Sequence, residues 1–131
     1  MRTLCCRLQR GDDLLLSLQK LARENRIDAG VILCGVGCVS RARLRDASGV
    51  TVRSLDEPCE IVSMTGTVSA ARCHVHLALS REDLSTLGGH LMEGCIINTT
   101  CELVLGIPDG WRFGVEQDAR TGYDEIVFQE V

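Results

Sequence analysis

The chain contains three histidines, and all of them lie in one short segment, Cys73 to Gly94. Side chains alternate between the two faces of an extended strand, so His74 and His76 project from the same side, one step apart. Neutral imidazoles that converge on one point are ligands for zinc and similar divalent transition metals. If His90 joins the pair, the spacing predicts a three-histidine metal site. Ordinary polar packing of hydrogen-bonded histidines is the alternative.

The segment between the second and third histidines decides whether His90 can reach the other two. Residues 80–89 are rich in turn-forming types, and the Gly88-Gly89 pair permits a tight backbone bend. We therefore expect the chain to bend at these glycines and to return His90 over the histidine strand.

Period-two alternation of apolar residues predicts a protein built mainly of strands. The chain begins with a strand over residues 3–9, followed by one helix that Asp12 and Asp13 open with capping carboxylates. Residues 31–39 are apolar on both faces, which predicts a central strand covered on each side. Further strands are expected over residues 50–53, 59–68, 73–79, 95–105, 111–115 and 123–131.

Two carboxylates are candidate neighbours of the histidines. Regular alternation over residues 59–68 places Glu60 on one face with Val62 and Met64, in the strand before the histidines. Glu102 lies inside an otherwise apolar strand, where an unpaired carboxylate is costly, so it should pair with Arg7 or with an imidazole N–H. A solvent-exposed strand carboxylate is an equally good interpretation of Glu60.

A row of arginines at two-residue spacing follows the central strand. Arg41, Arg43 and Arg45 would share one face and could contact an anion such as a phosphate. A solvated sheet edge is the commoner role for such a row.

Length and composition indicate one domain, residues 1–131, with a single core. The net charge of −4 and the aromatic content of 3% disfavour broad attachment to nucleic acid. No apolar run is long enough for a membrane span, and the first residues lack the apolar core of a secretion signal. The eight cysteines form no paired metal-binding knuckles, so we expect reduced thiols and a cytoplasmic location.

Several motifs resemble one known family, the PPC domain, which is conserved in plants and prokaryotes. The segments that carry the resemblance are HVHLALS at 74–80, LGGHLMEGC at 87–95 and TCELVL at 100–105. Weaker matches are RLQRGDDL at 7–14, GVG at 35–37 and EIVSMTGTV at 60–68. The similarity covers about residues 1–106, and the tail, with its strand at 123–131, is less diagnostic.

The resemblance implies an α/β fold of the α+β type: a single domain with a mainly antiparallel sheet flanked by helices, assembling as a homotrimer. It also implies that His74, His76 and His90 hold a metal, with zinc the expected cofactor. Candidates for supporting these ligands or contacting a bound molecule are Glu102, Glu60, Arg7, Gly89 and Thr100.

Three functions follow as hypotheses. The first is a metal site that binds or acts on an unidentified small molecule, with the question of enzyme activity open. The second is a DNA-binding or transcription-associated protein, although the Arg-Gly-Arg hook that grips the minor groove in plant members is absent. The third is a trimeric assembly module in which the metal is structural.

Overall fold

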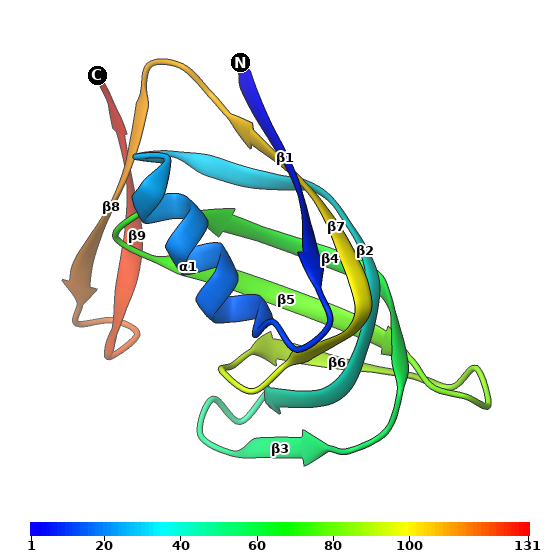
Figure 1. Ribbon diagram of the computed structural model, residues 1–131. Helices are drawn as coiled ribbons and strands as arrows, with labels where there is room; N and C mark the ends of the chain where they lie inside the picture. The colour runs from blue at the N-terminus through cyan, green and yellow to red at the C-terminus, as the bar shows by residue number, and fades with distance from the viewer.

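The computed structural model describes all residues, Met1–Val131, and is dominated by antiparallel strands (Figure 1). The elements are β1 (Arg2–Gln9), α1 (Leu14–Glu24), β2 (Gly30–Arg45), β3 (Val52–Leu55), β4 (Cys59–Val68), β5 (Cys73–Ser80), β6 (Thr86–Leu91), β7 (Ile96–Ile107), β8 (Trp111–Asp118) and β9 (Tyr123–Glu130). The main sheet has the order β1-β7-β2-β4-β5-β6, and β3 pairs with β2. The long strand β2 also pairs with β6 at its far end, which curves the sheet.

The helix covers the inner side of this curved sheet (Figure 1). Asp13 caps it, because one carboxylate oxygen accepts a hydrogen bond from the backbone N–H of Leu16 at 3.0 Å. Leu14, Leu18 and Ala22 recur at helical spacing and are fully buried against the strands. The expected helix start is therefore confirmed.

The mainly antiparallel sheet is confirmed, but the expectation that several helices flank it was wrong, because α1 is the chain's one helix. The outer side of the central strands is open: Leu33, Val36 and Val62 are 50, 51 and 56% exposed. The related prediction that residues 31–39 are covered on each side is also wrong within one chain. Apolar runs indicate that a face will be covered, but they do not say whether this chain or another molecule covers it.

Strand β4 departs from the regular alternation expected of it. The register with β5 shifts between Ile61 and Ser63, which marks a β-bulge. The extra residue exchanges the faces, so Met64 is buried and does not share the exposed side of Val62. Met64 also fills the space beside Gly35, where a Cβ atom would lie 2.7 Å from its sulfur.

The C-terminal hairpin forms a small sheet of its own, β8-β9. The expected strands over residues 111–115 and 123–131 are present, and Phe113 and Phe128 pack edge to face with ring centroids 5.0 Å apart. The backbone N–H of Phe113 donates to the carbonyl of Asp28 at 2.8 Å, which attaches the hairpin to the main body. All eight cysteines are free thiols. The single helix of the chain is too short to cross a bilayer.

Candidate metal centre

The β5–β6 hairpin brings the three histidines together. In its antiparallel register His76 lies opposite His90, and His74 lies two residues before His76 on the same face of β5. The alternating residues Val75, Leu77 and Leu79 are buried, as the sequence predicts. The histidines therefore occupy the side of the hairpin that faces away from the core.

The expected bend at the glycine pair was wrong, although His90 returns as predicted. The turn lies at Arg81–Ser85, and Gly88 and Gly89 are regular positions within β6. A Cβ atom on Gly88 would lie 2.3 Å from the carbonyl oxygen of Leu77, and one on Gly89 would lie 2.8 Å from that of Arg45. The glycines are thus required for close approach of the neighbouring strands, and not for a bend.

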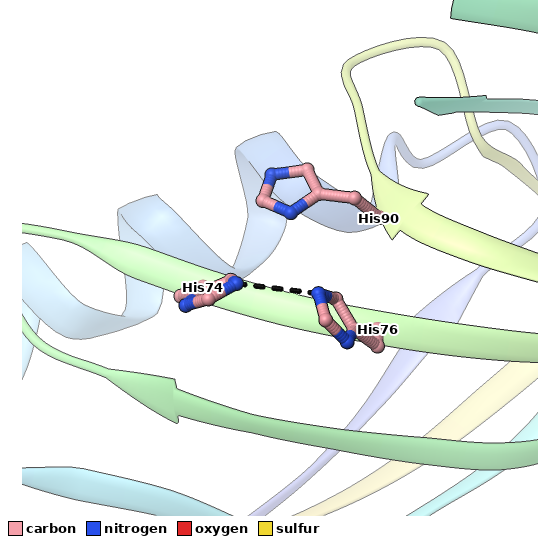
Figure 2. A group of neighbouring side chains, drawn as sticks. All are labelled: His74, His76 and His90. Atoms are coloured by element: carbon pink, nitrogen blue, oxygen red, sulfur yellow. Dashed lines mark hydrogen bonds between the residues drawn. The ribbon is translucent and has the colours of Figure 1, made fainter. Parts of the chain in front are cut away.

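The three imidazole rings project toward a common space (Figure 2). The Nε2 atoms of His74 and His76 are 3.2 Å apart, and one ring nitrogen from each of the three histidines falls within 4.8 Å of the others. Ring centroids are separated by 5.0 to 5.5 Å. Figure 2 shows the ring of His90 reaching over the other two from β6, with one nitrogen turned toward them.

The surroundings of His90 and His74 favour the neutral imidazole, the form that binds metals. Burial, and then the positive charge of Arg45, lowers the pKa of His90 to about 4. Burial, and then Arg72, also lowers the pKa of His74 below its ordinary value. At neutral pH these rings therefore carry free lone pairs, as metal ligands must.

Arg45 is the functional-site residue that sequence reasoning did not connect to the histidines. It ends β2 opposite His90 in the β2–β6 pairing, and its Nη2 lies 3.5 Å from His90 Nδ1. Its Nε is buried without a hydrogen-bond partner. The rest of its predicted row is engaged elsewhere, because Arg41 pairs with Asp56 at 3.2 Å and Arg43 reaches the carbonyl of Glu93 at 3.4 Å.

Two hollows of about 390 Å³ each adjoin the histidines. His74, His90 and Arg45 line both of them. The first also has Arg72 and Glu125 in its wall, with Tyr123 and Asp124 of β9, and the second has His76, Gly88, Gly89 and Asp46. The C-terminal hairpin, the least diagnostic part of the sequence, thus helps to enclose the site.

Of the five predicted supporting residues, Gly89 lies at the histidines and four do not. Glu60 pairs with Ser80 at the opposite end of β5. The exposed Glu102 and Arg7 lie opposite each other on β7 and β1, and Thr100 lies opposite Gln9 in the same pair of strands. Two strands, β2 and β4, separate β7 from the histidine strand β5.

A family model for the Plants and Prokaryotes Conserved (PCC) domain matches residues 1–107. The chain belongs to this family, which is the PPC domain that its sequence motifs resemble. Among solved structures, a hypothetical protein from Salmonella cholerae-suis is 32% identical, with a TM-score of 0.95 over 98% of this chain and 94% of that one. A metal-containing protein from Archaeoglobus fulgidus is 27% identical, with a TM-score of 0.83 over 97% of this chain and 94% of that one.

The PCC chain also resembles part of a much longer protein. Over 125 residues it is 39% identical to the bifunctional protein GlmU of Synechococcus sp. (strain JA-2-3B'a(2-13)), a match that covers 95% of this chain and 20% of that protein. The chain therefore spans about a fifth of the length of the curated relatives that it matches.

Proposed function

We propose that this PCC domain binds one divalent transition metal ion, with zinc the first candidate, through His74, His76 and His90. We further propose that the metal-loaded site binds or acts on a small molecule. The convergence of one ring nitrogen from every histidine of the chain is the observation that supports this function. The ligand set is all nitrogen, which suits zinc and its neighbours better than magnesium or calcium.

The spacing of the rings agrees with this role. Two nitrogens bound tetrahedrally at 2.0–2.1 Å from one zinc ion are about 3.3 Å apart. The two Nε2 atoms of His74 and His76 are separated by 3.2 Å (Figure 2). A hydrogen bond between two neutral imidazoles has a similar length, and a metal titration separates the two possibilities. The metal-containing relative from Archaeoglobus fulgidus adds support, because it shares this fold at 27% identity.

Three protein ligands leave one position of a tetrahedral ion open to water or to a bound molecule. When bound, zinc would act as a Lewis acid at this position and lower the pKa of a bound water. The chain's own residues would hold the ion, because the antiparallel pairing of β5 and β6 fixes the positions of His76 and His90. The two hollows give a small molecule access to it.

Elemental analysis of untagged protein, purified without chelator, tests the proposal. We expect one zinc or similar ion per chain in the wild type and almost none in His74→Ala and His90→Ala variants. Thr65→Ala is the matched control, since Thr65 lies opposite His76 on β4 but offers no imidazole. Metal-free wild type that also fails to bind added zinc or cobalt would refute the site.

The same variants separate a functional metal from a structural one. If His90→Ala keeps its circular dichroism spectrum and its mass in solution, the metal serves binding or chemistry. If fold or assembly is lost with the metal, the assembly-module hypothesis is favoured.

DNA binding is the weaker alternative. Two arginines of the row that would contact phosphates are engaged within the chain, because Arg41 pairs with Asp56 and Arg43 donates to the backbone carbonyl of Glu93. The net charge of −4 also opposes attraction to a duplex. Salt-dependent binding to duplex DNA at physiological ionic strength, measured by fluorescence anisotropy, would favour this alternative.

We also propose that copies of the chain assemble through the open outer side of the sheet, as a homotrimer. The side chains of Leu33, Val36 and Val62 are about half exposed on the central strands β2 and β4. Apolar side chains gathered on the middle of a sheet favour burial against another surface. In a trimer, the two other copies, arranged around a three-fold axis, would supply that surface.

A further inference from the structure

Arg45 has no acidic partner although it ends a strand inside the candidate metal centre. None of the chain's six ion pairs includes it, and its buried Nε has no hydrogen-bond partner. The one polar contact of its side chain is with His90, where Nη2 lies 3.5 Å from Nδ1. A buried guanidinium N–H without a partner is uncommon in native proteins, and it marks Arg45 as a cation that the rest of the chain does not satisfy.

The other charged groups around the hollows leave this cation uncompensated. Arg72 adds a second positive charge, and its Nη1 donates to the backbone carbonyl of Asp124 at 2.8 Å. The side chain of Asp46 pairs with Arg53 at 3.0 Å. Two further carboxylates, those of Asp124 and Glu125, belong to the wall of one hollow, but neither forms an ion pair with an arginine there.

A bound metal ion would add to the excess of positive charge around Arg45. Three neutral imidazoles do not reduce the charge of a divalent ion, and Arg45 lies against one of them, His90. Two positive charges at such short range repel each other strongly in a partly buried site. An anion that contacts both the ion and the terminal N–H groups of the guanidinium would remove this repulsion.

From this arrangement we infer that the ligand of the site is a small oxyanion, a carboxylate or phosphoryl group, held by Arg45 with one oxygen at the open metal position. This inference rests on the proposed metal site and adds the chemical class of its ligand. The planar guanidinium presents adjacent N–H donors that match the paired oxygens of such groups. A hollow of about 390 Å³ accommodates a small molecule that carries the anion.

The test uses wild-type protein loaded with cobalt(II), whose visible absorption changes when an anion replaces water on the ion. Acetate and inorganic phosphate are titrated separately, so that the tighter of the two identifies the preferred group. Arg45→Gln should retain the metal and bind the better anion at least about tenfold more weakly, as loss of a charge-assisted hydrogen bond predicts. Arg41→Gln, which removes the same charge from the same strand, should bind like wild type.

Arg45→Lys keeps the charge but loses the paired donors, so it should bind the anion more weakly than wild type. If the glutamine variant does not fold, this lysine variant tests the inference in its place. Wild-type affinity in whichever of these variants folds would overturn the inference, as would cobalt-loaded wild type whose spectrum neither anion changes. A chain that binds no metal would instead refute the proposed function, and the inference with it.

Discussion

His76 on β5 and His90 on β6 lie directly opposite each other in the antiparallel ladder, with ring centroids 5.5 Å apart. A cross-strand pair of this kind is fixed by backbone hydrogen bonds, and its rings project to the same side of the sheet. The third ring, that of His74, is placed by strand alternation alone. The centre is therefore preorganised by one hairpin, and its geometry depends on how closely β6 approaches its neighbours.

Gly89 sets that approach. A Cβ atom at this position would lie 2.8 Å from the backbone carbonyl oxygen of Arg45, which cannot move without its strand. We expect Gly89→Ala to push β6 away from β2, to displace the adjacent His90, and to lower the free energy of unfolding by about 1–3 kcal/mol. Urea unfolding and calorimetric titration with zinc would measure the two effects.

Gly114→Ala is the matched control, because its nearest contact is 3.9 Å away in the separate β8–β9 sheet. Zinc affinity and stability equal to wild type in Gly89→Ala would contradict the role assigned to this glycine.

The metal-free protein should lose stability as the pH falls from about 6.5 toward 4. The pKa of His90 is lowered to about 4, below its ordinary value, so over this window the unfolded chain binds more protons than the folded one. His74, whose pKa is also lowered, contributes in the same direction. Stability from these groups is therefore present above the window and is lost within it.

Urea unfolding of chelator-treated protein at pH 7 and pH 5 would measure this loss. His90→Asn, which cannot titrate, should lose less stability between the two values than wild type does. An equal loss in both proteins would show that other groups cause the pH dependence.

Much of this centre follows from local sequence patterns, and the rest depends on contacts between distant segments. Alternation places His74 and His76 on one face, and a hairpin of suitable length returns His90. The position of Arg45 could not be predicted, because it follows from pairing between β2 and β6. No local pattern predicts which residues of two distant strands will pair.

The faces on which strand residues lie also depend partly on local alternation and partly on pairing with a distant strand. The sequence predicted the residues of β4 correctly, but one bulge after Ile61 reversed the expected sides of Met64 and its neighbours. A bulge arises where register with a neighbouring strand must shift, so its position depends on pairing and not on composition. The interior alternation of β5, which has no such shift opposite β6, was predicted without error.

Asp13 should be the most sensitive polar residue away from the centre. One of its carboxylate oxygens accepts the N–H of Leu16 at 3.0 Å, and the other accepts the N–H of Gly94 at 2.8 Å. It thus caps α1 and attaches the helix to the segment that follows β6. We expect Asp13→Ala to cost about 2–4 kcal/mol in the free energy of unfolding, from loss of a cap and of a charge-assisted bond.

Asp13→Asn keeps one acceptor oxygen and should cost about half as much, since an amide caps nearly as well as a carboxylate. Chemical denaturation of both variants checks the order. A cost for alanine no larger than for asparagine would mean that the cap, which asparagine keeps, contributes nothing. An asparagine variant as stable as wild type would mean that the bond to Gly94 contributes nothing.

The open outer side of the sheet gives the prediction for assembly. Wild type should have a mass in solution of about three times the 14.3 kDa of one chain. Val36→Glu places a charge on the central strand β2, at a side chain that is 51% exposed in a single chain. An interface that buried this carboxylate without a partner would be strongly disfavoured, so the variant should be a monomer.

Light scattering coupled to size-exclusion chromatography would measure both masses. Val50→Glu is the matched control: Val50 is also exposed, at 79%, but it lies in the turn between β2 and β3. A wild-type monomer would contradict the assembly, and an unchanged trimer in Val36→Glu would place the interface elsewhere. If the monomeric variant still retains its metal, the centre is complete within one chain, as the convergence of His74, His76 and His90 from a single hairpin leads us to expect.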